Sequence, residues 1–196
     1  MPTHNDYDEG LQHAAGSAPI DDIDTSLMVR AAGGDLAAFE ELVRRNQGGA
    51  WALAWRFLGD AAEAQDIVQE AFLRIYKAAP RYRPTAAFRT YLYRVVARLC
   101  LDWKAKKRPE YVETLFSTPD GSRDPEAGVV VAQLSGAVQK CLADLPPNQR
   151  IAITLRHYEG MTYDEIAEVL DLSSKAVDSL LQRARDALRR GLAAYR

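Results

Sequence analysis

The side chains best suited to chemistry lie between residues 81 and 108, where basic residues alternate with aromatic ones. Aromatic rings stack on unpaired nucleic-acid bases, and Arg or Lys side chains neutralise the phosphates of the same strand. The interval therefore predicts the capture of single-stranded nucleic acid. In the alternative interpretation some rings belong to the core, which we expect of Tyr93 and Trp103, whereas Phe88 and Tyr91 lie near a Pro-rich loop and are expected to be functional.

Charge is segregated along the chain. The formal net charge is only −2, but residues 74–108 hold eleven Lys or Arg against one acid, Asp102, which is a local charge of +10. Residues 1–27 hold six acids and no Lys or Arg. A block as basic as 74–108 attracts a phosphate backbone whatever the charge of the rest of the chain.

A second candidate site for nucleic acid is the helix-turn-helix spacing of residues 162–188. Thr162 and Glu165 have the pattern of a capping box, and Asp171 falls where the chain must turn sharply in a left-handed conformation. In this motif the second helix enters the major groove and reads base edges. Its outward positions are polar: Lys175, Asp178, Ser179, Gln182, Arg183 and Arg185. The alternative is an ordinary helical hairpin with a solvated face.

A third candidate surface is acidic. On the predicted helix 61–78, Asp66, Gln69 and Glu70 lie opposite the apolar stripe, and Leu73 is expected to be exposed beside them. A solvated acidic face is the simplest interpretation. The exposed leucine favours a docking surface for a basic protein.

The elements that must hold these residues are helical in the first domain, which we predict to be residues 25–108. Ile67, Val68, Ala71, Phe72 and Ile75 recur at helical spacing on one face. Earlier in the domain, the segment that contains Phe39, Leu42 and Val43 and the segment from Trp51 to Leu58 are predicted to be separate helices. Before the domain, residues 1–24 have little apolar periodicity and predict a disordered acidic tail.

A second helical domain is predicted at residues 126–196. Residues 109–125 contain three prolines and lack helical periodicity, which is typical of a linker. No β-type alternation of useful length occurs along the chain. We therefore predict an all-α fold of two small helical bundles joined by a flexible linker, the C-terminal bundle containing the helix-turn-helix.

Composition argues against several other classes of protein. No apolar run is long enough for a transmembrane helix, and the acidic N-terminus does not fit a secretory signal, so we expect a cytoplasmic protein. His4, His13 and His157 are scattered and no Gly-rich phosphate loop is present, so an enzyme, a cofactor and a small-molecule substrate are not expected. Cys100 and Cys141 form no CxxC pair, so neither metal nor redox chemistry is expected, and both are predicted to be buried structural thiols.

Taken in this order, the motifs resemble the extracytoplasmic-function (ECF) sigma family, the two-domain class of RNA polymerase sigma subunits. The resemblance covers nearly the whole chain from about residue 25. It is carried by DLAAFEELVRRNQ (35–47), AAEAQDIVQEAFLRIYKA (61–78), AFRTYLYRVVARLCLDWKAKKR (87–108), LADLPPNQRIAITLRHYEGMTYDEIAEVLDLS (142–173) and SLLQRARDAL (179–188). It implies that 25–108 is the region 2 domain and 126–196 the region 4 domain of a factor that directs promoter-specific transcription initiation.

The resemblance also implies partners: core RNA polymerase, promoter DNA and an anti-sigma factor. The residues implied to dock on the β′ clamp of the polymerase are Asp66, Gln69, Glu70 and Leu73. The residues implied to bind and help melt the −10 element are Phe88, Arg89, Tyr91, Arg94 and Arg98. The residues implied to contact the −35 duplex are Arg156, Lys175, Ser179, Gln182 and Arg183. The C-terminal domain is implied to rest on the β flap.

Three positions depart from the family pattern and concern the promoter that is preferred. Arg98 stands where many members carry Asn, and Asp178 and Leu180 replace residues that are commonly basic. Two other kinds of protein fit parts of the pattern. A stand-alone helix-turn-helix regulator leaves the aromatic block and the acidic helix face unexplained, and an adaptor would use its surfaces only for protein contacts.

Overall fold

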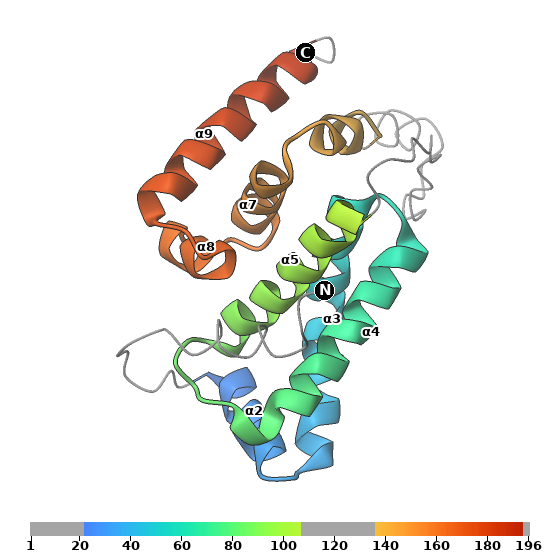
Figure 1. Cartoon of the computed structure of the whole chain (residues 1–196), viewed down its shortest axis with the longest axis vertical. Helices are drawn as coiled ribbons and strands as arrows, with labels where there is room; N and C mark the ends of the chain where they lie inside the picture. Colours follow the sequence, from blue (N-terminus) through green and yellow to red (C-terminus); the bar gives the residue numbers. More distant parts are fainter. Residues whose placement is uncertain (1–21, 107–135, 194–196) are drawn as a thin grey trace, which may run out of the picture.

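The computed structural model describes residues 22–106 and 136–193 (Figure 1). Its elements are α2 (Ile23–Ala32), α3 (Leu36–Leu58), α4 (Ala61–Ala78), the 3₁₀ helix η1 (Ala79–Arg81), α5 (Phe88–Lys106), α7 (Pro147–Tyr158), α8 (Tyr163–Leu170) and α9 (Ser174–Gly191). Residues 136–143 are also helical. Neither described range contains a strand, so the prediction of an all-α fold is confirmed. The predicted linker, 109–125, and nearly all of the predicted tail lie outside the described residues.

Aspartates begin three helices of the N-terminal bundle. Asp22, Asp35 and Asp60 are the N-caps of α2, α3 and α4, and each side chain accepts a hydrogen bond from the main-chain N–H three residues later. Such caps satisfy amide groups that have no partner inside the helix. Because Asp22 is the cap, α2 begins at Ile23, two residues before the predicted start of the domain.

Helix α3 is continuous where the sequence predicted two helices. It runs through Gly48 and Gly49, although each helical glycine costs about 1 kcal/mol relative to alanine. Gly49 lies where α5 approaches α3: a Cβ atom there would be 2.6 Å from the Tyr93 hydroxyl oxygen. Packing of α3 against α2, α4 and α5 offsets the low helix propensity of the glycine pair.

The apolar stripe of α4 is buried as predicted, with its members Ile67, Val68, Ala71, Phe72 and Ile75 in the core. Burying a large aliphatic or aromatic side chain contributes roughly 1.5–3 kcal/mol. This stripe packs on α3 and α5, so the opposite side of α4 faces solvent. Within residues 22–106 and 136–193, no helix is both long and apolar enough to cross a bilayer.

The C-terminal bundle has the predicted helix-turn-helix. Thr162 and Glu165 form the capping box of α8, and Asp171 adopts the left-handed conformation with φ of 55°. Ser173 then caps α9 by accepting a hydrogen bond from the N–H of Ala176. The buried stripe of α9 is Val177, Leu181 and Ala184. The sharp turn and the two caps fix the angle at which α9 leaves α8.

The two bundles are in contact. Figure 1 shows α5 running between the α3–α4 pair and the C-terminal helices, and α5 packs against α8 while α3 packs against α7. Buried apolar residues from both bundles form one contiguous cluster. Helix α5, which carries the residues predicted to bind the −10 element, is therefore covered on one side by the C-terminal bundle.

Candidate nucleic-acid and polymerase interfaces

The three arginines predicted to bind the −10 element all lie on α5 but do not share one face. Arg94 and Arg98 are four residues apart and project from adjacent turns. Arg89 projects from a different side of the helix than Arg94 and Arg98. Its guanidinium carbon lies 5.5 Å from the centre of the Tyr93 ring. Arg89 and Arg98 are exposed and Arg94 is half-buried.

The aromatic residues of α5 that were predicted to lie in the core do so, but Phe88 differs from the prediction. Tyr93 is buried and Trp103 is half-buried against the core, so both belong to it as expected. Phe88 is fully buried, with its main-chain N–H donating to the buried Thr25 hydroxyl at 3.0 Å. The expectation that Phe88 is a functional rather than a core ring is therefore wrong for this structure, because no base can reach it. Tyr91 is half-buried.

Tyr91 belongs to a small aromatic cluster with Tyr82, which is also half-buried, and the buried Phe88. Its ring centre lies 5.6 Å from that of Tyr82 and 6.3 Å from that of Phe88. Tilted rings at such distances attract one another by about 0.5–1.5 kcal/mol beyond their burial. Phe88 thus packs against Tyr91 from the core. Burial also raises the pKa of the Tyr82 hydroxyl to about 12.

Several polar side chains of α5 donate hydrogen bonds to acceptors in the C-terminal bundle. Arg89 donates to the main-chain oxygen of Glu159 and, at 3.3 Å, to its carboxylate, while the Tyr93 hydroxyl donates to the same carboxylate. Arg94 Nε donates to the carbonyl oxygen of Glu168 at 2.9 Å. Burial and the negative Glu159 both raise the pKa of Tyr93, which keeps its hydroxyl protonated as a donor. The sequence gives no local signal for Glu159, because its partners lie 66 and 70 residues away.

A buried arginine that was not predicted as a functional residue joins the two bundles. Arg150, only 4% exposed, donates to Phe57 O at 2.6 Å, near the end of α3, and to the carbonyl oxygens of Ala143 and Leu145. Carbonyls at helix C-termini lack partners inside the helix and attract cations. Arg150 therefore serves the end of a helix in each bundle. Burial lowers its pKa to about 10, which leaves it charged at neutral pH.

The exposed side of α4 carries the predicted acidic residues. Asp66 and Gln69 are exposed, and Glu70 is half-buried and pairs with Arg74 at 2.7 Å. Leu73 is 46% exposed, as predicted. Tyr76, which was not predicted, is 44% exposed three residues after Leu73 and packs on Phe39 with ring centres 5.0 Å apart. Helical spacing from Leu73 could have identified it. We call Asp66, Gln69, Glu70, Leu73 and Tyr76 the α4 surface.

Four of the residues predicted to contact the −35 duplex lie on α9. Lys175, Gln182 and Arg183 are exposed and Ser179 is half-buried. Their spacing of four, three and one residues keeps them on one side of the helix. Arg183 Nε donates to Ser179 O at 3.2 Å, which holds its side chain along α9.

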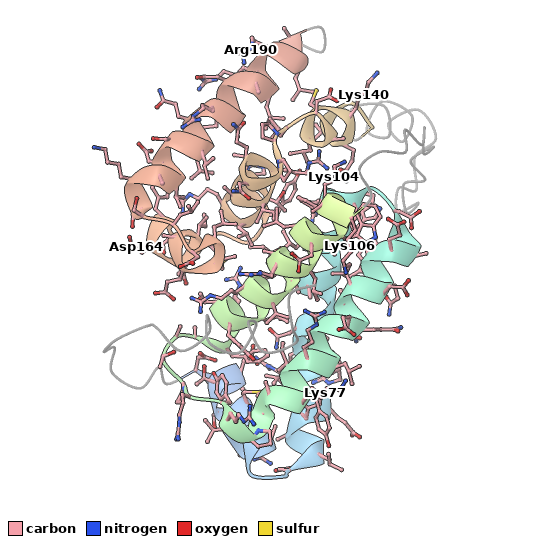
Figure 2. The ribbon with its side chains drawn as sticks, in the orientation of Figure 1. Lys77, Lys104, Lys106, Lys140, Asp164 and Arg190 are labelled. Atoms are coloured by element: carbon pink, nitrogen blue, oxygen red, sulfur yellow. The ribbon has the colours of Figure 1, made fainter. Side chains whose placement is uncertain are left out.

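Arg156 comes to this region from α7. Its guanidinium donates to Met161 O at 2.8 Å and lies 5.4 Å from the centre of the Tyr163 ring. The Tyr163 hydroxyl accepts from Arg185 of α9 at 3.2 Å. At the start of α8, Asp164 (Figure 2) accepts from the Ser174 hydroxyl at 2.5 Å. These contacts bring Arg156 to the start of α8, beside Tyr163.

Further cations extend the basic block at the end of α5. Lys104 and Lys106 are exposed there (Figure 2). Cys100, one turn earlier, is fully buried as expected, and burial raises the pKa of its thiol to about 12. Cys141 is only half-buried. In the part of the chain that the structure describes, no cluster of three or more His, Cys, Asp or Glu could hold a metal ion.

Comparison with protein families identifies both bundles. The family described as Sigma-70 region 2 matches residues 42–110, and the family described as Sigma-70, region 4 matches residues 135–188. The first match covers most of α3 together with α4 and α5, and the second covers α7, α8 and most of α9.

Whole-chain relatives agree. The RNA polymerase sigma-H factor of Pseudomonas aeruginosa is 34% identical over 86% of this chain and 93% of its own length. The ECF RNA polymerase sigma factor SigW of Bacillus subtilis is 33% identical over 81% of this chain and 91% of its own. Among solved structures, CnrH in complex with the cytosolic domain of CnrY has 31% sequence identity and a TM-score of 0.67, with 88% of this chain and 99% of that chain covered. With two sigma regions in order and full-length relatives of this kind, the chain belongs to the ECF family of RNA polymerase sigma factors.

Proposed function

We propose that this sigma factor binds core RNA polymerase through the α4 surface, which docks on the β′ clamp, while the C-terminal bundle rests on the β flap. The α4 surface combines carboxylates with the exposed Leu73 and Tyr76. Apolar residues within a charged rim are typical of protein interfaces. The family resemblance supports the identity of the partner.

DNA recognition is proposed to be divided between the bundles. Arg89, Tyr91, Arg94 and Arg98 of α5 hold the −10 strand after melting, and Phe88 supports Tyr91 from the core. Lys175, Ser179, Gln182 and Arg183 of α9, with Arg156, contact the −35 duplex. A helix of the α9 type enters the major groove, where Gln and Arg side chains discriminate between base pairs.

The observation that carries the proposal is the placement of three unlike surfaces on one small chain: the acidic and apolar α4 surface, the basic α5 and the polar face of α9. A stand-alone regulator of duplex DNA needs only the last of these. The chain itself offers no metal site among the described residues, and the chemistry of RNA synthesis belongs to the polymerase.

Regulation by an anti-sigma factor is also proposed. The family resemblance implies it, and the solved relative CnrH was captured with the cytosolic domain of another protein, CnrY. An inhibitor that covers the α4 surface would prevent polymerase binding. Both the factor and the polymerase would meet in the cytoplasm.

The test is run-off transcription with purified core RNA polymerase on a library of promoter fragments from the source genome, with and without this protein. We expect specific transcripts only when the protein is added, and their start sites define the −10 and −35 sequences. Duplex DNA binding without any transcript would instead support the stand-alone regulator.

A further inference from the structure

Two of the α5 residues proposed for the −10 strand, Arg89 and Arg94, already donate hydrogen bonds to the other half of the chain. Arg89 and Tyr93 both donate to the Glu159 carboxylate, and Arg94 donates to Glu168 O. Carboxylate and carbonyl oxygens are the same kind of acceptor that phosphate oxygens offer to these donors. The Glu159 side chain is 13% exposed, so a DNA strand cannot reach Arg89 from that side without displacing it.

The contact is built at several points. Glu159 is the C-cap of α7, and Gly160, with φ of 66°, turns the chain away directly after it. Gly49 leaves the space: a Cβ atom there would lie 3.6 Å from the Glu159 carboxylate as well as 2.6 Å from the Tyr93 hydroxyl. Next to Glu159, the ring of Tyr158 lies 3.9 Å from the guanidinium of Arg56 on α3.

This arrangement cannot serve both promoter elements at once. Elements centred near −35 and −10 are about 25 base pairs apart, which is about 85 Å along a duplex at 3.4 Å per base pair. Here the helix-turn-helix domain lies directly against α5, because α8 packs on it. Binding of both elements therefore requires the two bundles to separate.

We propose that Glu159 acts as an internal mimic of a DNA phosphate: it holds the chain in a closed form in which the C-terminal bundle and a single DNA strand compete for Arg89 and Arg94. This inference rests on the proposed −10 role of α5. A binding-competent form that is only partly populated weakens the apparent affinity in proportion to its population. Separation of the bundles would then accompany DNA binding.

The test compares the full-length chain with Glu159→Gln and Glu159→Ala in binding a random-sequence single-stranded DNA pool about 12 nucleotides long, followed by fluorescence anisotropy at several salt concentrations. The matched control is Glu168→Gln, which removes one charge at the edge of the same contact but leaves the main-chain oxygen that Arg94 uses. We expect several-fold tighter binding for both Glu159 variants and a salt dependence steeper by about 0.7 per arginine released, with Glu168→Gln close to wild type. An equal gain in Glu168→Gln would mean general repulsion and would overturn the proposal.

A second measurement uses the wild-type chain, so that misfolding of a variant cannot decide the outcome. Amide hydrogen exchange of α8 and of residues 156–161 is followed with and without saturating single-stranded DNA. We expect faster exchange with DNA, because the strand displaces the C-terminal bundle. If DNA binds but the exchange rate is unchanged, the proposed closed form is wrong and the −10 role of α5 stands. If none of the four proteins (wild type, Glu159→Gln, Glu159→Ala and Glu168→Gln) binds DNA, both the −10 role of α5 and this inference are wrong.

Discussion

At Arg150 a buried cation meets three carbonyl oxygens that would otherwise lack a partner. Phe57 O lies near the end of α3, Ala143 O lies at the end of the helix that precedes α7, and Leu145 O lies in the turn after that helix. Leaving a buried acceptor unsatisfied costs about 1–3 kcal/mol. The side chain therefore stabilises the ends of two helices and the contact between the bundles together.

We predict that Arg150→Met lowers the free energy of unfolding by roughly 2–4 kcal/mol, because methionine fills the space but donates no hydrogen bond. Arg150→Lys should lose less, since it keeps the charge and some of the donors. Urea denaturation followed by circular dichroism measures both. The control is Arg44→Met, whose side chain is 70% exposed and pairs only with Glu41 in the contacts described, and which should cost below about 0.5 kcal/mol. Equal losses at the two positions would contradict this role.

Asp171 is the non-glycine residue with a positive φ among those described. An L side chain in the left-handed region is strained by roughly 1 kcal/mol, somewhat less for Asp. We predict that Asp171→Gly raises the stability of the C-terminal bundle by roughly 0.5 kcal/mol, the relief of strain exceeding the added flexibility of the unfolded chain. Thermal denaturation measures the change. Asp171→Ala should give no gain, and a gain of the same size would show that the side chain rather than the backbone matters.

At the scale of elements, α9 is proposed to combine two kinds of contact that separate experiments can distinguish. Lys175 lies in its first turn and Gln182 two turns later, both exposed. A lysine on a phosphate adds affinity without regard to sequence, whereas a glutamine on a base edge adds discrimination.

We therefore predict that Lys175→Ala weakens binding to all duplex promoters and lowers the salt slope by about 0.9, while Gln182→Ala relaxes the preference at one base pair by about 1–3 kcal/mol. Competition binding to duplexes with single-base changes in the −35 element, repeated at several salt concentrations, measures both effects. Arg189→Ala, at the far end of α9 and paired with Asp186, is the control and should change neither. Identical profiles for the two variants would argue against this division.

The elements were predictable where the signal is local. The capping box of Thr162 and Glu165, the left-handed turn at Asp171 and the stripe of α4 each depend on residues a few positions apart, and the structure confirms all three. The break expected between Val43 and Trp51 was wrong: α3 continues through Gly48 and Gly49, although helix propensity disfavours both. Gly49 is determined by tertiary packing against Tyr93 of α5, and helix propensity does not describe such packing.

The surroundings of Phe88 and Glu159 could not be predicted from local sequence patterns. An aromatic residue at the start of α5 has the same sequence signature whether its ring stacks on a base or fills the core, and here Thr25 and the core hold it. Glu159 sits 70 residues from Arg89, so no periodicity connects them. Contacts between bundles depend on how two separately folded surfaces meet, and a single sequence carries no pattern for that.

At the scale of the whole molecule, charge is divided so that different sides suit different partners. The basic α5 lies against the C-terminal bundle, while the α4 surface faces away from the stripe that packs on α3 and α5. The α4 surface makes no part of the contact between α5 and α8. Polymerase binding through α4 and DNA binding through α5 should therefore be separable by mutation.

We predict that Glu70→Lys lowers the affinity for core RNA polymerase by at least ~10-fold, because it reverses a charge at the proposed interface and places it beside Leu73. Inside the chain it replaces the pair with Arg74 by a like-charged pair, a cost of about 0.5 kcal/mol that leaves the fold intact. Leu73→Ala should weaken the same binding through lost apolar contact. Fluorescence anisotropy of the labelled factor titrated with core enzyme measures both.

The matched control is Glu41→Lys on α3, which breaks a comparable surface pair with Arg44 in the same bundle. Single-stranded DNA binding by all three variants is measured in parallel, and it should equal that of the wild type, because none of the changes touches α5 or Glu159. If Glu41→Lys weakens polymerase binding as much as Glu70→Lys, net charge and not the α4 surface determines docking. If Glu70→Lys binds core enzyme like the wild type, the polymerase must approach from another side, and the exposed Leu73 and Tyr76 then need a different partner.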